Sequence, residues 1–174
     1  MTFLPPVMPL PPVRSLDPAP AIRAVAEALQ PDLAQGRPID AARLRLEMER
    51  AFGGSDASGA WDWKLAYEAG EVALVLFLRK FGRALLTRAG SPAALLPIVA
   101  KVACLLPTHT RRSEEMERFQ QFSTPLPMGL AALAAAQITP RDLVLEPSAG
   151  TGLLAILAEI AGGNLALKIG RAHV

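Results

Sequence analysis

The sequence lacks the features that mark several large protein classes. It has a single cysteine, Cys104, so no internal disulfide can form. No apolar run approaches the roughly 20 residues of a membrane helix; the run Val72 to Leu78 has seven. The net charge is only +2, so no global basic field indicates nucleic acid. No spacing of His, Cys or carboxylates indicates a metal site. The composition, 51% apolar and 20% charged, favours a folded, soluble protein of the cytoplasm.

Proline is plentiful but unevenly distributed. Seven of the 16 prolines fall in residues 1–20, which predicts a Pro-rich, extended leader rather than a helix or a central strand. Residues 21–110 read as a helical N-terminal region. A first helix over 21–29 is expected to stop near Pro31. Cys104 stands among apolar neighbours and is expected to be a small core residue.

Three further helices are indicated by capping residues and apolar spacing. Asp40 can cap a helix that ends at Gly53-Gly54, with Leu44, Met48 and Phe52 on one face and Arg43–Glu47 and Arg45–Glu49 as ion pairs. The next helix has the clearest stripe, Trp63, Tyr67, Gly70, Leu74 and Phe77. Arg79 and Lys80 are expected near its C-terminal end. Ser91-Pro92 opens the last of these helices, and Pro107 closes it.

The pattern changes over residues 111–167. A short polar helix is expected at 113–120, and Thr124-Pro125 is a cap-plus-first-residue signal for another that ends before Thr139-Pro140. A strand at 143–145, a turn at 146–152, an apolar helix at 153–161 and a strand start at 165–167 follow. The fold class predicted is mainly α, followed by the first β-α-(β) unit of a Rossmann-like α/β domain.

The turn at 146–152 is the candidate ligand-binding segment. Glycines at 150 and 152 let the backbone approach a ligand closely, and the helix that follows points free N–H groups into the loop. Glu146, at the end of the strand, suits an ammonium or a ribose hydroxyl. S-adenosylmethionine has a matching carboxylate, ammonium and ribose diol. The spacing Gly150-x-Gly152-x-x-Ala155 also fits a loose dinucleotide fingerprint, and a turn without any ligand is the third interpretation. A phosphate-binding P-loop is excluded, because Leu153 follows Gly152.

Two motifs in order support the first interpretation. The segment Glu146 to Gly152 resembles motif I of class I methyltransferases, especially the N6-adenine DNA methylases. Gln121-Phe122-Ser123-Thr124-Pro125 resembles the N-terminal cofactor motif of that group. The stretch 112–167, with the helical part 40–106, resembles the methylase-like N-terminal region of bacterial strawberry-notch-type proteins, which precedes a DEAD/DEAH-like helicase region.

The resemblance implies a cofactor site and partners. S-adenosyl-L-methionine would be held by two groups of residues: Phe122, Thr124 and Pro125, and Glu146, Pro147, Ser148, Ala149, Gly150, Thr151 and Gly152. DNA would be the partner of the whole protein, together with further methylase and helicase regions. No catalytic residue is identified, because the Pro-Pro-aromatic motif that receives a flipped adenine is absent, so this chain is expected to be inactive and to bind the cofactor weakly or not at all. The alternative is a non-catalytic helical scaffold that docks DNA for a helicase.

The last seven residues, 168–174, break the pattern. Where the family has an acidic residue after the second strand, Leu167 is followed by Lys168. The tail from Ile169 to Val174 can be written as ATC-GGA-AGA-GCA-CAC-GTC, a reading frame of a widely used sequencing adapter. The expectation is therefore an artefactual tail on a chain truncated at about residue 167.

Overall fold

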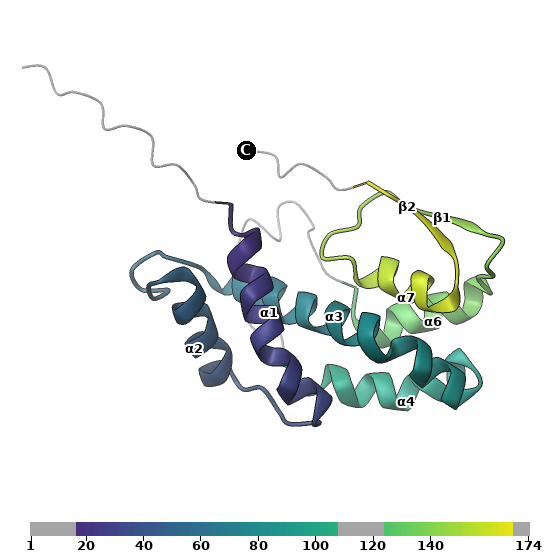
Figure 1. Ribbon diagram of the computed structural model, residues 1–174, viewed down its shortest axis with the longest axis horizontal. Coiled ribbons are helices and arrows are strands. Elements are labelled where there is room, and N and C mark those ends of the chain that lie inside the picture. Colours follow the sequence, from purple (N-terminus) through teal and green to yellow (C-terminus); the bar gives the residue numbers. More distant parts are fainter. Residues whose placement is uncertain (1–16, 108–123, 169–174) are drawn as a thin grey trace, which may run out of the picture.

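The computed structural model describes residues 17–107 and 124–168, so Phe122, the segment 113–120 and most of the leader lie outside the described residues. Five long or medium helices and a short strand–helix–strand unit follow one another (Figure 1). The elements are α1 (Ala19–Ala34), α2 (Ala41–Phe52), α3 (Trp63–Ala89), α4 (Pro92–Ala103), α6 (Leu126–Ala136), β1 (Leu143–Glu146), α7 (Leu153–Ala161) and β2 (Asn164–Leu167).

Three helices begin at a capping side chain, and the caps at Asp40 and Ser91 were predicted from the sequence. The side chains of Asp40, Asp62 and Ser91 each accept a hydrogen bond from the backbone N–H three residues ahead, at 2.7, 2.8 and 3.1 Å. Such a cap contributes about 1 kcal/mol to helix stability. The end of α2 at Gly53 is also confirmed, with a left-handed φ of 70° that glycine adopts without strain. Local chemistry alone thus fixes these boundaries.

Other boundaries differ from the sequence prediction because tertiary contacts override local signals. Helix α1 continues through Pro31 to Ala34, since Leu33 is only 2% exposed and its burial holds the last turn in place. Helix α3 runs to Ala89, so Arg79 and Lys80 lie well before its end, contrary to prediction. Helix α6 starts after Pro125 without a side-chain cap, so Thr124 does not serve as one.

Two side chains in the helical region also have different surroundings from those expected. Arg45 forms an ion pair of 3.2 Å with Asp56 and lies over the ring of Trp63, instead of pairing with Glu49. Cys104 is exposed at the C-terminal cap of α4, so the prediction that it is a core residue was wrong. The Arg43–Glu47 pair is present as predicted. These corrections all concern where side chains point once the helices have packed.

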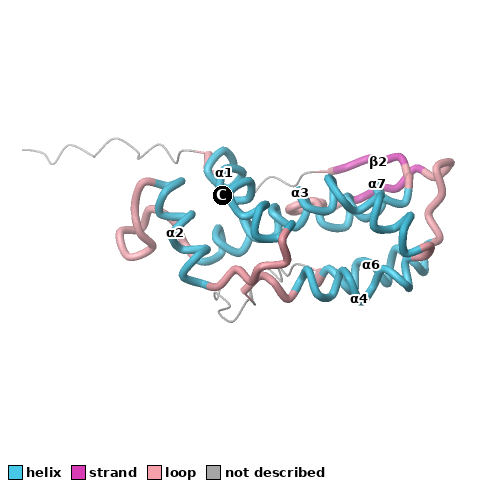
Figure 2. The backbone as a smooth tube through the Cα atoms, turned by 60° about the horizontal axis from the view of Figure 1, so that its bottom comes forward, coloured by secondary structure: helices cyan, strands magenta, loops and turns pink. Residues whose placement is uncertain are grey.

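The sheet has two parallel strands, with Leu143 opposite Asn164 and Glu146 opposite Leu167. Helix α7 connects them and packs on one face, as in the start of a βαβ unit. Figure 2 shows the strands at the margin of the molecule, with helices on one side. On the other side Leu143 and Leu145 are 73% and 69% exposed. The fold observed is therefore mainly helical with a small parallel sheet.

One hydrophobic core joins the helical region to the strand–helix–strand unit. Buried side chains from Val25 in α1 to Ile160 in α7 form a single cluster. At the centre, α3 approaches α7 so closely that a Cβ atom at Gly82 would collide with Ile160. At the surface, Arg79 of α3 pairs with Glu159 of α7 at 3.3 Å. The glycine-containing turn is consequently built against α3 and does not project from the body on its own.

Candidate functional site

The turn after β1 has the compact form expected of a ligand loop. The amide of Ser148 donates to the Glu146 carboxylate at 2.9 Å, and the amide of Gly152 donates to the Ala149 carbonyl at 2.7 Å. Gly150 and Gly152 have φ values of 50° and 92°, in the left-handed region where a side chain would be strained. The two glycines are therefore needed for the conformation of the loop.

This loop leaves hydrogen-bond donors open. Within the part of the chain that the structure describes, no acceptor faces the amides of Gly150 and Thr151. Helix α7 has no side-chain cap either, and its first backbone bond runs from the Ile156 amide to the Gly152 carbonyl. Open amides at a helix start, together with the helix dipole, attract a carboxylate or another oxygen-rich group. The loop thus has the donors that the sequence analysis assigned to it.

The second predicted motif lies at the same end of α7. Gly129 of α6 sits against Leu154 and Leu157, where a Cβ atom would come within 3.0 Å of both side chains. Further along, Ile138 lies against Gly163, which follows α7. The order of these contacts means that α6 and α7 run in the same direction. Thr124 and Pro125, just ahead of α6, are therefore on the same side as the loop, although they are about 25 residues away in sequence.

An apolar hollow of about 170 Å³ lies between α6, β1 and α7. Its walls are mostly alanine, leucine and isoleucine side chains, and Val144 contributes from the strand. Among the described residues, Glu146 is the one charged residue that lines it. Because Oε1 of Glu146 accepts a hydrogen bond from the Ser148 amide, the carboxylate lies where the apolar surface meets the loop with its open amides. Ligands with both an apolar part and polar oxygens suit such a border.

A further residue, missed in the sequence analysis, contacts the loop. Glu71 of α3 is 9% exposed, and its Oε2 accepts a hydrogen bond of 3.0 Å from Oγ1 of Thr151. A sequence signal for it exists: Glu71 is four residues after Tyr67 and three before Leu74, so it falls on the buried stripe of its helix. A carboxylate on a buried face needs a partner, and the partner is 80 residues away.

Two carboxylates contact the loop, Glu71 at Thr151 and Glu146 at Ser148, and the Lys168 carbonyl accepts from the Ala149 amide. Glu68 lies one turn before Glu71 on α3, and burial raises the pKa of its carboxyl above the ordinary value. Nearby Lys64 opposes that increase and Glu71 adds to it. These carboxylates would repel a dianionic group such as a pyrophosphate and would attract a ligand that carries a cation.

Comparison with protein families, with curated proteins and with solved structures finds no match for this chain. Among residues 17–107 and 124–168, no group of histidine, cysteine and acidic side chains is arranged to hold a metal ion. No helix in these two stretches is long and apolar enough to cross a membrane. The loop and its surroundings are therefore the features that bear on function.

Proposed function

We propose that this chain carries the cofactor loop of an S-adenosylmethionine-dependent methyltransferase region, of the DNA-adenine type found in strawberry-notch-like methylase–helicase proteins. The observation that carries the proposal is the position of the loop. The Glu146–Gly152 turn follows the carboxyl end of a parallel strand and opens α7, with Thr124-Pro125 at the same end of the neighbouring helix. In α/β folds that edge of the sheet is where ligands bind.

The charges around the loop favour this cofactor over a dinucleotide. S-adenosylmethionine offers a carboxylate to the open amides and a sulfonium and an ammonium to the carboxylates of Glu146 and Glu71. A dinucleotide would bring its pyrophosphate to the same loop and face those carboxylates instead. A turn without a ligand would leave the amides of Gly150 and Thr151 to water, and the titration described below separates it from a ligand loop.

Binding by this chain is expected to be weak. Two strands and one connecting helix supply one side of a pocket, and Lys168 stands where the family has a ribose-binding acid. The described residues supply no group in position to activate an adenine amine, so we expect no methyl transfer by this chain alone.

A titration that detects weak binding tests the proposal. In ¹⁵N-labelled chain, millimolar S-adenosylmethionine is expected to shift the amide resonances of residues 148–153 and to leave those of α2 in place. The neutral product S-adenosylhomocysteine is expected to shift them less at equal concentration, and NAD less still. A chain that shows no loop shifts at millimolar cofactor, or equal shifts with NAD, would overturn the proposal.

The matched control uses two glycines. Gly150→Leu places a side chain at a left-handed position of the loop and is expected to abolish the shifts. Gly59→Leu makes the same change at another left-handed glycine, φ 74°, in the turn between α2 and α3. Gly59→Leu carries the same kind of strain but is expected to leave the cofactor shifts intact.

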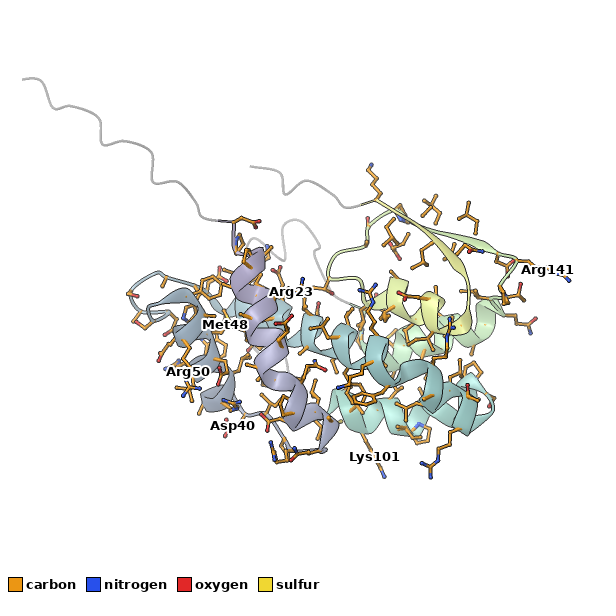
Figure 3. All side chains as sticks on the ribbon, viewed as in Figure 1. Arg23, Asp40, Met48, Arg50, Lys101 and Arg141 are labelled. Atoms are coloured by element: carbon orange, nitrogen blue, oxygen red, sulfur yellow. The ribbon has the colours of Figure 1, made fainter. Side chains whose placement is uncertain are left out.

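A second candidate function, DNA docking by the helical region, has an observation of its own. The segment 72–107 contains five basic residues and no acidic one. They are Arg79, Lys80, Arg83, Arg88 and Lys101, all exposed. Of these, only Arg79 has an acidic partner among the described residues. Lys101 points away from the body of the molecule (Figure 3). An exposed stretch of a single sign is the kind of surface that contacts phosphates.

Salt dependence separates DNA docking from cofactor binding. If this surface contacts phosphates, affinity for a short duplex should fall steeply with salt, and replacing Lys80, Arg83 and Arg88 with alanine should lower the salt slope by about 3. The control is the triple alanine substitution of Arg23, Arg37 and Arg50, each of which is paired with an acidic neighbour. Equal losses in both variants would show that only net charge matters and would count against a docking surface.

A further inference from the structure

Thr151 occupies a position where the backbone is free to turn. It stands between Gly150 and Gly152, both in the left-handed region. Glycine has no Cβ atom, so it permits this conformation but does not select it over others. The hydrogen bond from Gly152 to Ala149 closes the turn around Thr151, and a further contact at Thr151 itself would fix the orientation of the peptide groups on either side of it.

The local hydrogen bonds of the loop hold its other residues. Glu146 fixes Ser148, the Lys168 carbonyl accepts from Ala149 at 3.3 Å, and Ala149 in turn accepts from Gly152. Among the described residues, the backbone of Thr151 has no such bond. Its hydroxyl supplies the missing contact, since Oγ1 donates to Oε2 of Glu71 at 3.0 Å.

Glu71 is held in a fixed position relative to the loop because α3 packs closely against α7. The contacts occur in the same order along α3 and along the segment from the loop to the end of α7: Glu71 with Thr151, Arg79 with Glu159, and Gly82 with Ile160. Thr151 lies just ahead of α7, and the other two contacts involve the last residues of that helix. The two helices therefore run side by side in the same direction, and Glu71 cannot shift along α7 without breaking this packing.

We propose that Glu71 is a positioning residue for the glycine loop: by accepting a hydrogen bond from the Thr151 hydroxyl, it holds the amides of Gly150 and Thr151 ready for the ligand. The inference rests on the proposed function for what the ligand is. It assigns the helical region a direct part in the site, because the acceptor comes from α3. Preorganisation of this kind lowers the entropy that a ligand must remove from the loop on binding.

The first experiment needs no ligand. Thr151→Val keeps the shape of the side chain and removes the hydroxyl. Amide exchange at Gly152, whose bond closes the turn, is expected to become at least about tenfold faster, as for loss of a hydrogen bond to a charged group. The ¹⁵N order parameters of residues 150–152 are expected to fall from the rigid to the flexible range. Unchanged exchange and order parameters would overturn the proposal.

Two further variants separate positioning from general stability. Thr87→Val removes a hydroxyl that donates within α3 itself, to the Arg83 carbonyl, and is expected to leave the loop unchanged. Glu71→Gln retains an acceptor oxygen and is expected to keep the loop ordered. If Glu71→Gln loosened the loop as much as Thr151→Val, an accepting oxygen would not be what holds Thr151, and the proposal would fail.

The ligand titration then tests the link to function. Thr151→Val is expected to weaken the S-adenosylmethionine shifts about fivefold or more, in proportion to the lost order of the loop. Full cofactor affinity in a chain with a loosened loop would overturn the claim that the bond prepares the site. If the unsubstituted chain gives no shifts, the proposed cofactor is wrong, and the exchange data still decide whether Glu71 positions the loop.

Discussion

Helices begin differently in the two halves of the molecule, the helical half (α1 to α4) and the half that carries the glycine loop (α6 to β2). In the helical half, α2, α3 and α4 begin on side chains that each accept one backbone amide, and α1 begins on Pro18 without a side-chain cap. In the other half, α6 begins on Pro125 and α7 on Gly152, neither with a side-chain cap. A cap satisfies one of the first amides of a helix from within the chain. Where the cap is missing, that amide stays available, and the uncapped starts of α6 and α7 lie on the side of the molecule that carries the glycine loop.

The surfaces of the two halves differ in the same way. Around α1 and α2, charges are paired in a network that includes Asp32, Arg37, Arg43 and the buried Glu47. On the outer face of the sheet, large apolar side chains are left exposed. Among the described residues, the first half thus has many of its charges paired, whereas the second presents open amides, unpaired outer strand edges and an exposed sheet face. Substitutions placed in each half test this difference.

The largest effect is expected in the shared core. Leu78 of α3 is 1% exposed within the hydrophobic cluster, so Leu78→Ala should lower the free energy of unfolding by about 2–5 kcal/mol. The same change at Leu145, which is 69% exposed, should cost under about 0.5 kcal/mol. Chemical denaturation of both variants provides the measurement. Similar losses would mean that β1 is buried in solution and that the sheet is not open.

A smaller effect is expected at the two kinds of helix start. Gly152→Ala places a Cβ atom at φ 92° and should cost about 1–2 kcal/mol of stability. It should also remove the cofactor shifts. Asp62→Ala removes the cap of α3 and should cost about 1 kcal/mol without affecting the loop. Thermal unfolding and the amide titration, measured on both variants, test this difference. If Asp62→Ala also lost the cofactor shifts, the two kinds of helix start would not differ in their effect on the loop.

The sequence predicted the second half more closely than the first, for a physical reason. The bounds of α7, Leu153–Ala161, follow from glycines at each end, and the strands follow from short apolar runs beside them. These are local signals. The extension of α1 past Pro31 and the bond between Glu71 and Thr151 depend on segments that meet only in the folded chain. Sequence patterns therefore located the loop, but they could not reveal which helix would support it.

Within the helical half, acid should affect the contributions of Asp32 and Glu68 in opposite directions, by about 1 kcal/mol or less. Hydrogen bonding to Arg37, with a further bond to Arg43, lowers the pKa of Asp32 below its ordinary 3.8. Its stabilising effect is present above that value and is lost as the pH falls through the lower folded pKa. Burial raises the pKa of Glu68, so its carboxyl destabilises the fold at neutral pH and the loss is relieved on acidification.

Melting temperatures from pH 7 to pH 2 measure these contributions. Asp32→Asn should be less stable than the unsubstituted chain above pH 4, and the difference should vanish near pH 2. Glu68→Gln should be more stable at pH 7, with the difference gone below pH 4. A Glu68→Gln variant that is less stable at pH 7 would show that the carboxylate is stabilised by a partner instead of being penalised by burial.

The smallest effect on stability, but a visible one on solubility, is expected at the open face of the sheet. Leu145→Thr suits a strand and removes an apolar group from the surface, so unfolding free energy should stay within about 0.5 kcal/mol. Self-association, followed by light scattering at rising concentration, should decrease, because an exposed apolar strand is a template for pairing between chains. Leu46→Thr makes the same change at a 42% exposed leucine on α2 and should leave association unchanged. If both variants lowered association equally, general surface hydrophobicity, and not the open sheet, would be its cause.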